Sequence, residues 1–223
     1  MIRFDAWWFP DGETQLPDEM SKVNLRVDGR LTWQYHKYVA ALSLLPLDRR
    51  RVAVDVGAHV GLWSYYMARD FAELHAFEPN IEAAWCWGRN LPAGTVNGCD
   101  ARLHQCALGA DHGIVTLEQA PGQSGGAHIW PIASAGAEGT IEQRPLDDFE
   151  LDAVDLIKID VEGYETAVIE GARKTLLRCK PIVIVEEALW SRYGYDSAPA
   201  TDLVRLGMQQ RTALGPDKIY EWT

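Results

Sequence analysis

The chain has 223 residues, of which 47% are hydrophobic, so it is long enough to form one domain with a sizeable core. Its 21 Lys and Arg residues against 32 Asp and Glu give a formal net charge of −11, and an acidic surface repels a polyanion, so we expect no nucleic-acid partner. No apolar run is as long as a membrane span and the N-terminus is acidic, so we expect a cytoplasmic protein without a membrane partner.

Helical and strand patterns alternate along most of the chain. Residues 1–30 are irregular, with room for a hairpin, and residues 32–45 have apolar positions at three- and four-residue steps that predict a helix ended by Pro46. Short apolar runs then predict strands at 51–56, 73–79, 101–108, 153–161 and 181–189, and helical patterns predict helices at 61–71, 80–90, 163–178 and 200–207. A terminal hairpin is predicted from 208–214 and 217–223.

This alternation predicts an α/β, Rossmann-like fold. Strands that alternate with helices pair in parallel through right-handed crossovers, and near-continuous apolar strands are covered on both faces. We therefore expect a mostly parallel twisted sheet with an antiparallel C-terminal hairpin. Residues 109–150 break the alternation and predict a small inserted β region. Residues 1–46 are expected to form an N-terminal extension and helix, as a lid or on the substrate side, and residues 47–223 the main domain.

A glycine loop follows the first predicted sheet strand. Asp55 ends that strand, and Gly57 and Gly61 follow, which allows a tight turn and the close approach of a ligand at the carboxyl edge of the sheet. A dinucleotide fingerprint is not met, because His59 and Leu62 occupy the places of its second and third glycines. An acid in this position repels a pyrophosphate and attracts an ammonium group, which favours a cofactor that carries an amino acid.

A second acid ends the next predicted strand. Glu78 follows Asp55 by 23 residues, a spacing at which a carboxylate accepts hydrogen bonds from ribose hydroxyls. An ammonium group near Asp55 and a ribose at Glu78 together describe S-adenosylmethionine. The alternative is a doubly wound domain in which these acids only cap helices.

Six short motifs occur in a diagnostic order. They are VDVGAHVG, AFEPN, CALG, PLDDF, DLIKIDVEGYE and PIVIVEE. With them the chain resembles the FkbM family of S-adenosylmethionine-dependent methyltransferases over about residues 50–222, and IKIDVEGYE is the most specific element. The resemblance implies a class I methyltransferase fold.

The resemblance also implies which residues hold the cofactor. Many family members have Asn where this chain has His59, which can hydrogen-bond and also titrate. Cys106 has an alternative role as a small buried apolar residue, which we favour. The residues that the resemblance assigns to the cofactor are Asp55, Gly57, Ala58, His59, Gly61, Glu78, Pro79, Asn80, Cys106, Ala107 and Leu108.

The fourth predicted strand carries the candidate catalytic residues. Methyl transfer to a hydroxyl needs an aligned nucleophile and a base, and two close carboxylates raise one another's proton affinity. We expect Asp160 to be the base or the orienting group, and Glu162 either to share this role or to cap the next helix. Lys158 lies on the same strand face as Asp160 and needs an acidic partner, Asp160 or Glu186, for a structural or a catalytic role.

The predicted reaction is O-methylation of a hydroxyl on a small molecule or a sugar. An N-methyltransferase, a non-catalytic cofactor-binding module and a dinucleotide oxidoreductase are the alternatives. Asp160, Glu162 and Glu186 offer oxygen ligands suited to Mg²⁺, but the spacing does not require a metal and we expect none. His128 and Trp130 are candidate acceptor contacts, with packing of a loop tip against another chain as the alternative. The sequence does not indicate the oligomeric state.

Overall fold

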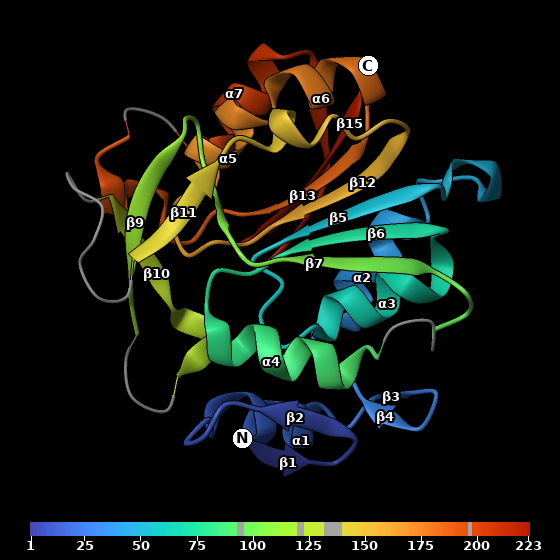
Figure 1. The fold of residues 1–223 in the computed structure, drawn as a ribbon. Helices are drawn as coiled ribbons and strands as arrows, with labels where there is room; N and C mark the ends of the chain where they lie inside the picture. Colours follow the sequence, from blue (N-terminus) through green and yellow to red (C-terminus); the bar gives the residue numbers. More distant parts are fainter. Residues whose placement is uncertain (93–95, 120–122, 132–139, 196–197) are drawn as a thin grey trace.

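The computed structural model describes residues 1–223 except 93–95, 120–122, 132–139 and 196–197 (Figure 1). Its centre is a seven-stranded sheet in the order β14-β15-β13-β12-β5-β6-β7. The strands are β5 (Val52–Val56), β6 (Glu73–Phe77), β7 (Asp100–His104), β12 (Val154–Ile159), β13 (Ile182–Glu186), β14 (Met208–Leu214) and β15 (Asp217–Trp222). The strands from β13 to β7 are parallel, and β15 and β14 are antiparallel. The predicted parallel sheet with an antiparallel C-terminal hairpin is confirmed.

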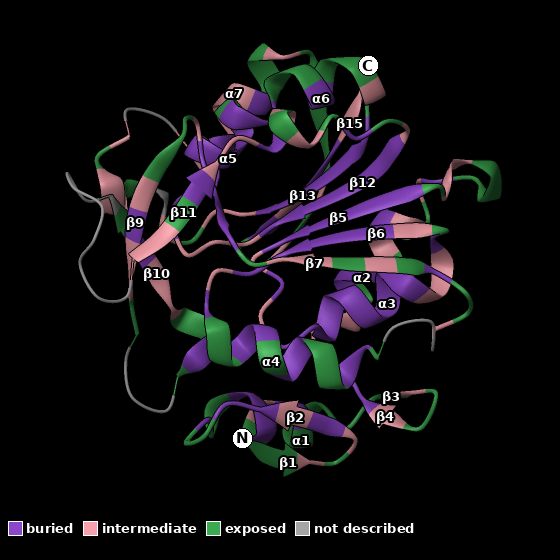
Figure 2. Ribbon diagram, in the orientation of Figure 1, coloured by how far each residue is buried: buried purple, intermediate pink, exposed green. Residues whose placement is uncertain are grey.

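Helices cover both faces of this sheet (Figure 1). One face carries α2 (Tyr35–Leu42), α3 (Leu62–Asp70) and α4 (Ile81–Asn90), and the other carries α5 (Glu165–Gly171), α6 (Arg173–Cys179) and α7 (Pro199–Arg205). The side chains of β5 alternate between the two cores: Ala53 packs on the α3 side, and Val52 and Val54 pack on the α5 side. Both cores are closed, as the buried colour of the central strands shows (Figure 2).

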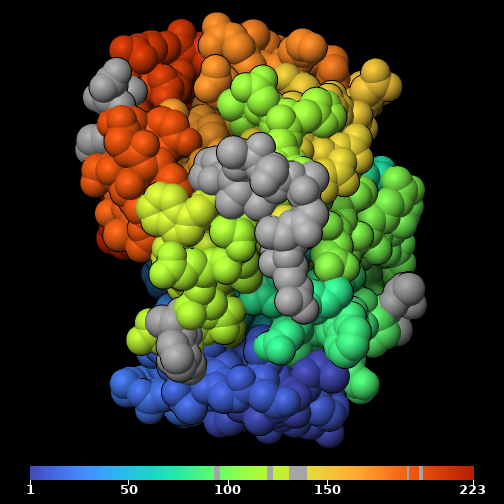
Figure 3. Space-filling view, turned by 60° about the vertical axis from the view of Figure 1, so that its left-hand side comes forward, coloured from blue at the N-terminus to red at the C-terminus, as the bar shows by residue number. Residues whose placement is uncertain are grey.

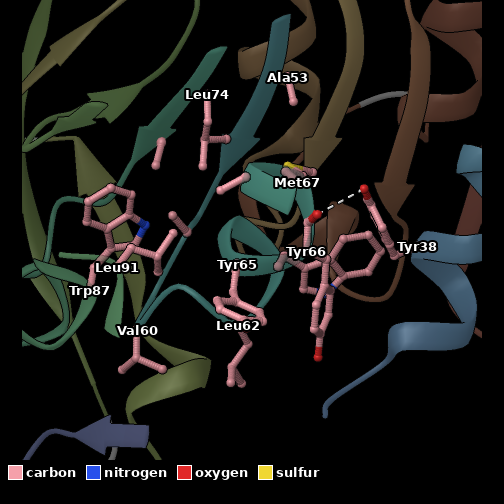
Figure 4. Packing of buried hydrophobic residues seen from close by; sticks show 14 of the residues in the cluster. Tyr38, Ala53, Val60, Leu62, Tyr65, Tyr66, Met67, Leu74, Trp87 and Leu91 are labelled. Carbon is pink, nitrogen blue, oxygen red and sulfur yellow. Dashed lines mark hydrogen bonds between the residues drawn. The ribbon is translucent and has the colours of Figure 1, made fainter. Parts of the chain in front are cut away.

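Aromatic side chains dominate the core on the α3 side. The Tyr38 hydroxyl on α2 donates to the backbone carbonyl of Tyr66 on α3 at 3.1 Å, so these two helices are joined by a polar contact within an apolar cluster (Figure 4). Leu62, Trp87 and Leu91 extend the same cluster under the glycine loop. The start of α3 is therefore held firmly, which fixes the position of the loop before it.

Two predicted elements are wrong in their extent. The strand expected at 101–108 is divided, because β7 is the edge of the central sheet and the chain leaves it after His104 to form β8 (Ala107–Leu108) in a second sheet. The helix expected at 163–178 is also divided, into α5 and α6. The break follows Gly171, where a Cβ atom would lie 2.0 Å from the carbonyl oxygen of Gly109.

The inserted β region is a mixed four-stranded sheet beside the carboxyl edge of the central sheet (Figure 1). Its order is β10-β9-β11-β8, with β9 (Gly113–Glu118), β10 (His128–Pro131) and β11 (Thr140–Arg144). Part of the Gly/Ser/Ala-rich stretch, 132–139, lies outside the described residues. Short 3₁₀ helices occur at Leu47–Arg49, Ser124–Gly126, Leu146–Phe149 and Trp190–Tyr193.

The N-terminal segment packs against α4 (Figures 1 and 3). It contains β1 (Ile2–Phe4), β2 (Trp7–Phe9), α1 (Gln15–Val23), β3 (Arg26–Val27) and β4 (Arg30–Leu31). The sequence patterns did not predict α1. Trp7 and Phe9 are fully buried in the α3-side core, so the segment is an integral layer of the molecule. None of the helices in the described ranges has the length and apolar character needed to cross a membrane.

Candidate active site

The order of the central sheet creates a crevice at the end of β5. The strand that follows β5 in the chain, β6, lies on one side of it, and β12 lies on the other, so the connections leave in opposite directions at this edge. Two adjoining cavities open here, with about 580 Å³ and about 1110 Å³ of empty space, counting the open solvent at their mouths. The residues common to both cavities are Gly57, His59, Gly125, Asp160 and Glu162.

The first cavity brings together most of the predicted cofactor residues. Its walls include the ends of two strands and the loops after them, from positions separated in the sequence. Burial raises the pKa of the Cys106 thiol to about 11, which fits the packing role favoured for this residue. The predicted cofactor residues in its lining are Gly57, His59, Glu78, Pro79, Cys106, Ala107 and Leu108.

Gly57 allows the glycine loop to touch β12. The backbone N–H groups of Gly57 and Ala58 both donate to the carbonyl of Phe77 at 3.0 Å, which ties the loop to β6. The φ angle of Gly57 is +74°, and a Cβ atom there would lie 1.9 Å from the backbone oxygen of Asp160. Only glycine fits between these two strands, so the loop brings the ends of β5 and β12 into direct contact.

The Glu78 carboxylate is held in a fixed orientation at the wall of the first cavity. Its Oε2 accepts from the backbone N–H of His59 at 2.7 Å, and its Oε1 accepts from that of Asn80 at 2.8 Å. Burial raises the pKa of Glu78 to about 7 although these hydrogen bonds oppose the shift. Asn80 itself caps α4, since its side-chain oxygen accepts from the N–H groups of Glu82 and Ala83. The predicted ribose contact of Glu78 remains a prediction.

Asp55 is enclosed by protein groups. Its carboxylate is fully buried, its Oδ2 accepts from the Ser64 hydroxyl at 2.6 Å, and its Oδ1 lies 3.6 Å from the Lys158 ammonium. Burial raises its pKa, against the effect of Lys158. Asp55 Oδ1 has no hydrogen-bond partner in the described part of the chain, but it is closed off from solvent and Asp55 lines neither cavity, so a direct contact with a cofactor ammonium requires a local rearrangement. The predicted direct contact therefore remains a prediction, whereas Asp160 lines both cavities.

Lys158 lies between the buried Asp55 and Asp160, which lines both cavities. Its ammonium lies 3.4 Å from Asp160 Oδ2 as well as 3.6 Å from Asp55 Oδ1, and it donates to the backbone carbonyl of Gly57 at 3.1 Å. The expected partner Asp160 is therefore present, and Asp55 is a second partner that the sequence did not indicate. Both acids raise the pKa of Lys158 against the opposing effect of burial, so the lysine is a cation.

Three carboxyl groups in the lining of the second cavity lie close together. One oxygen each from Asp160, Glu162 and Glu186 lies within 4.8 Å of the others. Burial, together with the neighbouring Asp160 charge, raises the pKa of Glu162 to about 7 and that of Glu186 to about 8, so this group shares protons near neutral pH. These oxygens also suit a divalent cation. Because carboxyls this close also hold shared protons, their geometry alone does not require a metal.

Glu165, rather than Glu162, holds the loop before α5. Its Oε1 accepts from the backbone N–H groups of Val161 and Gly163, each at 3.0 Å. Glu162 lines both cavities. Among the residues that the structure describes, no side chain caps α5, so Glu162 does not have the capping role considered for it.

The second cavity contains residues that sequence reasoning missed. Its outer wall comes from the N-terminal segment, which carries no recognisable motif, and from the start of α3. Of the two predicted acceptor contacts, His128 lines the first cavity, whereas Trp130 is 37% exposed and donates from its indole to Glu118. The missed residues in the lining are Glu13, Gln15, Leu16, Glu19, Gln34, Leu62 and Trp63.

The sheet order and the glycine loop beside strand-end acids define a class I methyltransferase fold. The chain belongs to the FkbM methyltransferase family, since the family model described as the methyltransferase FkbM domain matches residues 55–206. The family expected from the sequence motifs is thus confirmed.

Two named relatives are methyltransferases. "Methyltransferase 1" of Beauveria bassiana is 29% identical over 154 residues, covering 58% of this chain and 61% of that protein. "Methyltransferase sdnD" of Sordaria araneosa is 28% identical over 169 residues, covering 60% and 64%. The chain thus spans less than two thirds of both relatives.

The solved structures are similar in fold. The methyltransferase FkbM of Methylobacillus flagellatus has a TM-score of 0.54 at 20% identity, covering 78% of this chain and 44% of that one. The precorrin 8w decarboxylase of Methanobacterium thermoautotrophicum has a TM-score of 0.52 at 14% identity, covering both chains fully. At these identities the likeness concerns the fold alone.

Proposed function

We propose that this protein transfers the methyl group of S-adenosylmethionine to a hydroxyl group of a small molecule or a sugar. The observation that carries the proposal is the position of Asp160. It lines both cavities, and its side chain is 24% exposed, so one carboxylate faces the expected cofactor and the expected acceptor. A methyltransferase must bring the cofactor and the acceptor into contact, and a residue that lines both cavities lies where the two molecules would meet.

The residues of the first cavity fit the cofactor. Glu78 offers a fixed carboxylate for the ribose hydroxyls, and the apolar wall of Phe77, Ala107 and Leu108 suits an adenine ring. The junction with the second cavity, at Gly57 and His59, then receives the amino-acid end. When bound, the cofactor supplies a methyl group on a positively charged sulfur, which an oxygen nucleophile can displace.

The protein's own contribution to the reaction is alignment and proton removal. The acceptor oxygen forms a bond to the methyl carbon as the carbon–sulfur bond breaks, and its proton moves to a carboxylate at the junction, leaving a methyl ether and S-adenosylhomocysteine. Asp160 is the base or the orienting group, and Lys158 holds it from 3.4 Å away. Glu162, with a pKa of about 7, is the second group able to take the proton.

The second cavity favours an acceptor without negative charge. The carboxyl groups of Glu13, Glu19 and Asp160 line it, and Lys158 is the one cation among the described residues of this lining. Glu162 and Glu186, with pKa values of about 7 and 8, add only part of a negative charge at neutral pH. Phosphorylated and carboxylated acceptors are disfavoured by this field. The rings of Trp33 and Trp63 offer apolar faces on which a sugar or an aromatic acceptor can lie.

The test is methyl transfer from labelled S-adenosylmethionine into a metabolite extract, with identification of the labelled product. Asp160→Asn is expected to lower the turnover number at least about 100-fold while S-adenosylhomocysteine still binds. Asp152→Asn is the matched control, since that side chain is 90% exposed. A product labelled on nitrogen would favour the N-methyltransferase. Binding without any turnover by the wild type would favour a cofactor-binding module.

A further inference from the structure

A chain of hydrogen bonds joins the N-terminal segment to the glycine loop. The Ser124 side chain, in the inserted region, donates to Glu13 Oε2 with its hydroxyl, and the Ser124 backbone N–H donates to the same oxygen at 2.6 Å. The Ser124 hydroxyl oxygen lies 2.7 Å from Nε2 of His59. Glu13 is 2% exposed and Ser124 is 3% exposed, so this connection is shielded from water.

The direction of the protons in this chain follows from the charge of Glu13. Burial acts to raise the pKa of Glu13, but hydrogen bonds from Ser124 and Leu16 outweigh it and hold the pKa below its usual value. The carboxylate is therefore ionised and only accepts hydrogen bonds. The Ser124 hydroxyl has one proton and donates it to Glu13. Its oxygen must therefore accept a hydrogen bond from His59, which places the ring proton on Nε2.

The other ring nitrogen of His59 is then an acceptor that faces the cleft. Nδ1 makes no hydrogen bond within the described ranges. It is also not fully buried, so it is accessible from the cavities that His59 lines. Burial lowers the pKa of the imidazole to about 4, so the ring is neutral at neutral pH and its Nδ1 lone pair is available. The backbone at His59 has φ of +49°, in the left-handed region, which Asn and His adopt more readily than most residues.

We propose that Glu13 and Ser124 are positioning residues that hold His59 in the Nε2–H form, so that its Nδ1 accepts a hydrogen bond from a donor group bound at the junction of the two cavities. The N-terminal segment thereby contributes to the site through a polar contact as well as through its cavity wall. The inference rests on the proposed function for the identity of the donor. That donor is either the ammonium group of the cofactor or the hydroxyl group of the acceptor.

The form of the imidazole can be read directly by long-range ¹H–¹⁵N correlation spectra of ¹⁵N-histidine-labelled protein. The chain has six histidines, and His59→Asn, which tolerates the same backbone angle, assigns the signal by its loss. We expect His59 to show a protonated Nε2 and an unprotonated Nδ1. In Ser124→Ala this pattern is expected to change to a mixture of the two neutral forms, and Ser124→Thr, which keeps the hydroxyl, should restore it. Ser21→Ala is the matched control, because its hydroxyl bonds only to Pro17 within α1.

Calorimetry distinguishes the two sources of the donor. S-adenosylhomocysteine carries the ammonium group, and 5′-methylthioadenosine lacks the whole amino-acid end. If Nδ1 accepts from the ammonium, Ser124→Ala should weaken binding of S-adenosylhomocysteine by about 10-fold and leave that of 5′-methylthioadenosine unchanged. If it accepts from the acceptor hydroxyl, both affinities should stay the same while the rate of product labelling in the extract falls by a similar factor.

Two results would overturn the inference. One is a protonated Nδ1 in wild-type His59. The other is a Ser124→Ala protein that is folded but changes neither the spectrum of His59, nor the affinity for S-adenosylhomocysteine, nor the rate of labelling. Glu13→Gln serves where Ser124→Ala fails to fold, since an amide in place of the carboxylate can reverse the hydrogen bond to Ser124. A wild-type protein that does not bind S-adenosylhomocysteine contradicts the proposed function, whereas the spectrum of His59 tests the positioning separately.

Discussion

Lys158 and Asp55 are paired positions in the register of two neighbouring parallel strands, β12 and β5, and their side chains form an ion pair 3.6 Å apart on the covered α3 side of the sheet. The same ammonium lies 3.4 Å from Asp160, at the cleft. Lys158 is thus a buried cation between two acids, Asp55, which is closed off from solvent, and Asp160, which lines the cavities. The ion pair that stabilises the sheet therefore also helps to position the candidate base, Asp160.

Replacing only one partner of the Asp55–Lys158 ion pair should destabilise the folded protein. Lys158→Met leaves Asp55 buried without a counter-charge and is expected to lower the free energy of unfolding by about 3–5 kcal/mol. Urea unfolding measures the loss. The double variant Asp55→Asn/Lys158→Met should recover most of it because no fully buried charge is then left without a partner, since the remaining Asp160 carboxylate is 24% exposed to water. The exposed Lys174→Met is the control. An equal loss in the single and the double variant would contradict this account.

The glycine loop should not tolerate a side chain at its first glycine. Gly57→Ala places a methyl group 1.9 Å from the Asp160 oxygen at a φ of +74°, so we expect a loss of stability above about 2 kcal/mol and loss of S-adenosylhomocysteine binding. Gly88→Ala is the control, since it lies in α4 with open space around it and should gain about 0.5–1 kcal/mol. Thermal unfolding and calorimetry check both. Normal cofactor binding by Gly57→Ala would show that the loop is not where we place it.

Stability should fall between pH 6.5 and 8. Glu162 and Glu186 have folded pKa values of about 7 and 8, above their unfolded value near 4.5, so the folded state holds protons that the unfolded state has lost, and stability decreases as the pH rises through this range. His59 and His104, with folded pKa values lowered to about 4, act in the opposite sense only below about pH 6.5. Glu186→Gln should be about 1 kcal/mol more stable than the wild type at pH 8.5 and show a shallower decline in urea unfolding. If the stability of Glu186→Gln decreased more steeply with pH than that of the wild type, the prediction would be contradicted.

The cap of α4 should contribute to stability. Asn80→Ala removes the oxygen that accepts from Glu82 and Ala83, and it should cost about 1 kcal/mol in urea unfolding. Asn80→Asp keeps a capping oxygen and should retain most of the stability, although it loses the contact with Gln119. If both substitutions have the same effect, the side-chain cap is not the cause.

The sequence predicts most of the central sheet because its strands are buried on both faces. Val52 to Val54 and Ile182 to Val185 are continuous apolar runs, which only a covered strand needs, and the helices between them have a separate period. What periodicity cannot show is where a strand changes sheets. No glycine, proline, asparagine or aspartate interrupts residues 101–108, yet β7 and β8 pair with partners from different parts of the chain.

The candidate site is only partly predictable for a similar reason. Gly57, Glu78 and Asp160 lie at the ends of recognisable strands, and parallel strands bring such ends to one edge, so their proximity follows from the fold class. The pairing of Asp55 with Lys158 depends on the register of strands about 100 residues apart, and the contact of Glu13 with Ser124 joins two segments without periodic pattern. Neither has a local signal in the sequence.

The most direct measurement is calorimetric titration of the wild-type protein and of Glu78→Gln with S-adenosylhomocysteine and with NAD. We predict one site per chain for S-adenosylhomocysteine, no detectable affinity for NAD, and binding weakened by about 10- to 100-fold in Glu78→Gln, because that carboxylate is expected to hold the ribose. A wild-type protein that binds NAD and ignores S-adenosylhomocysteine would contradict the account.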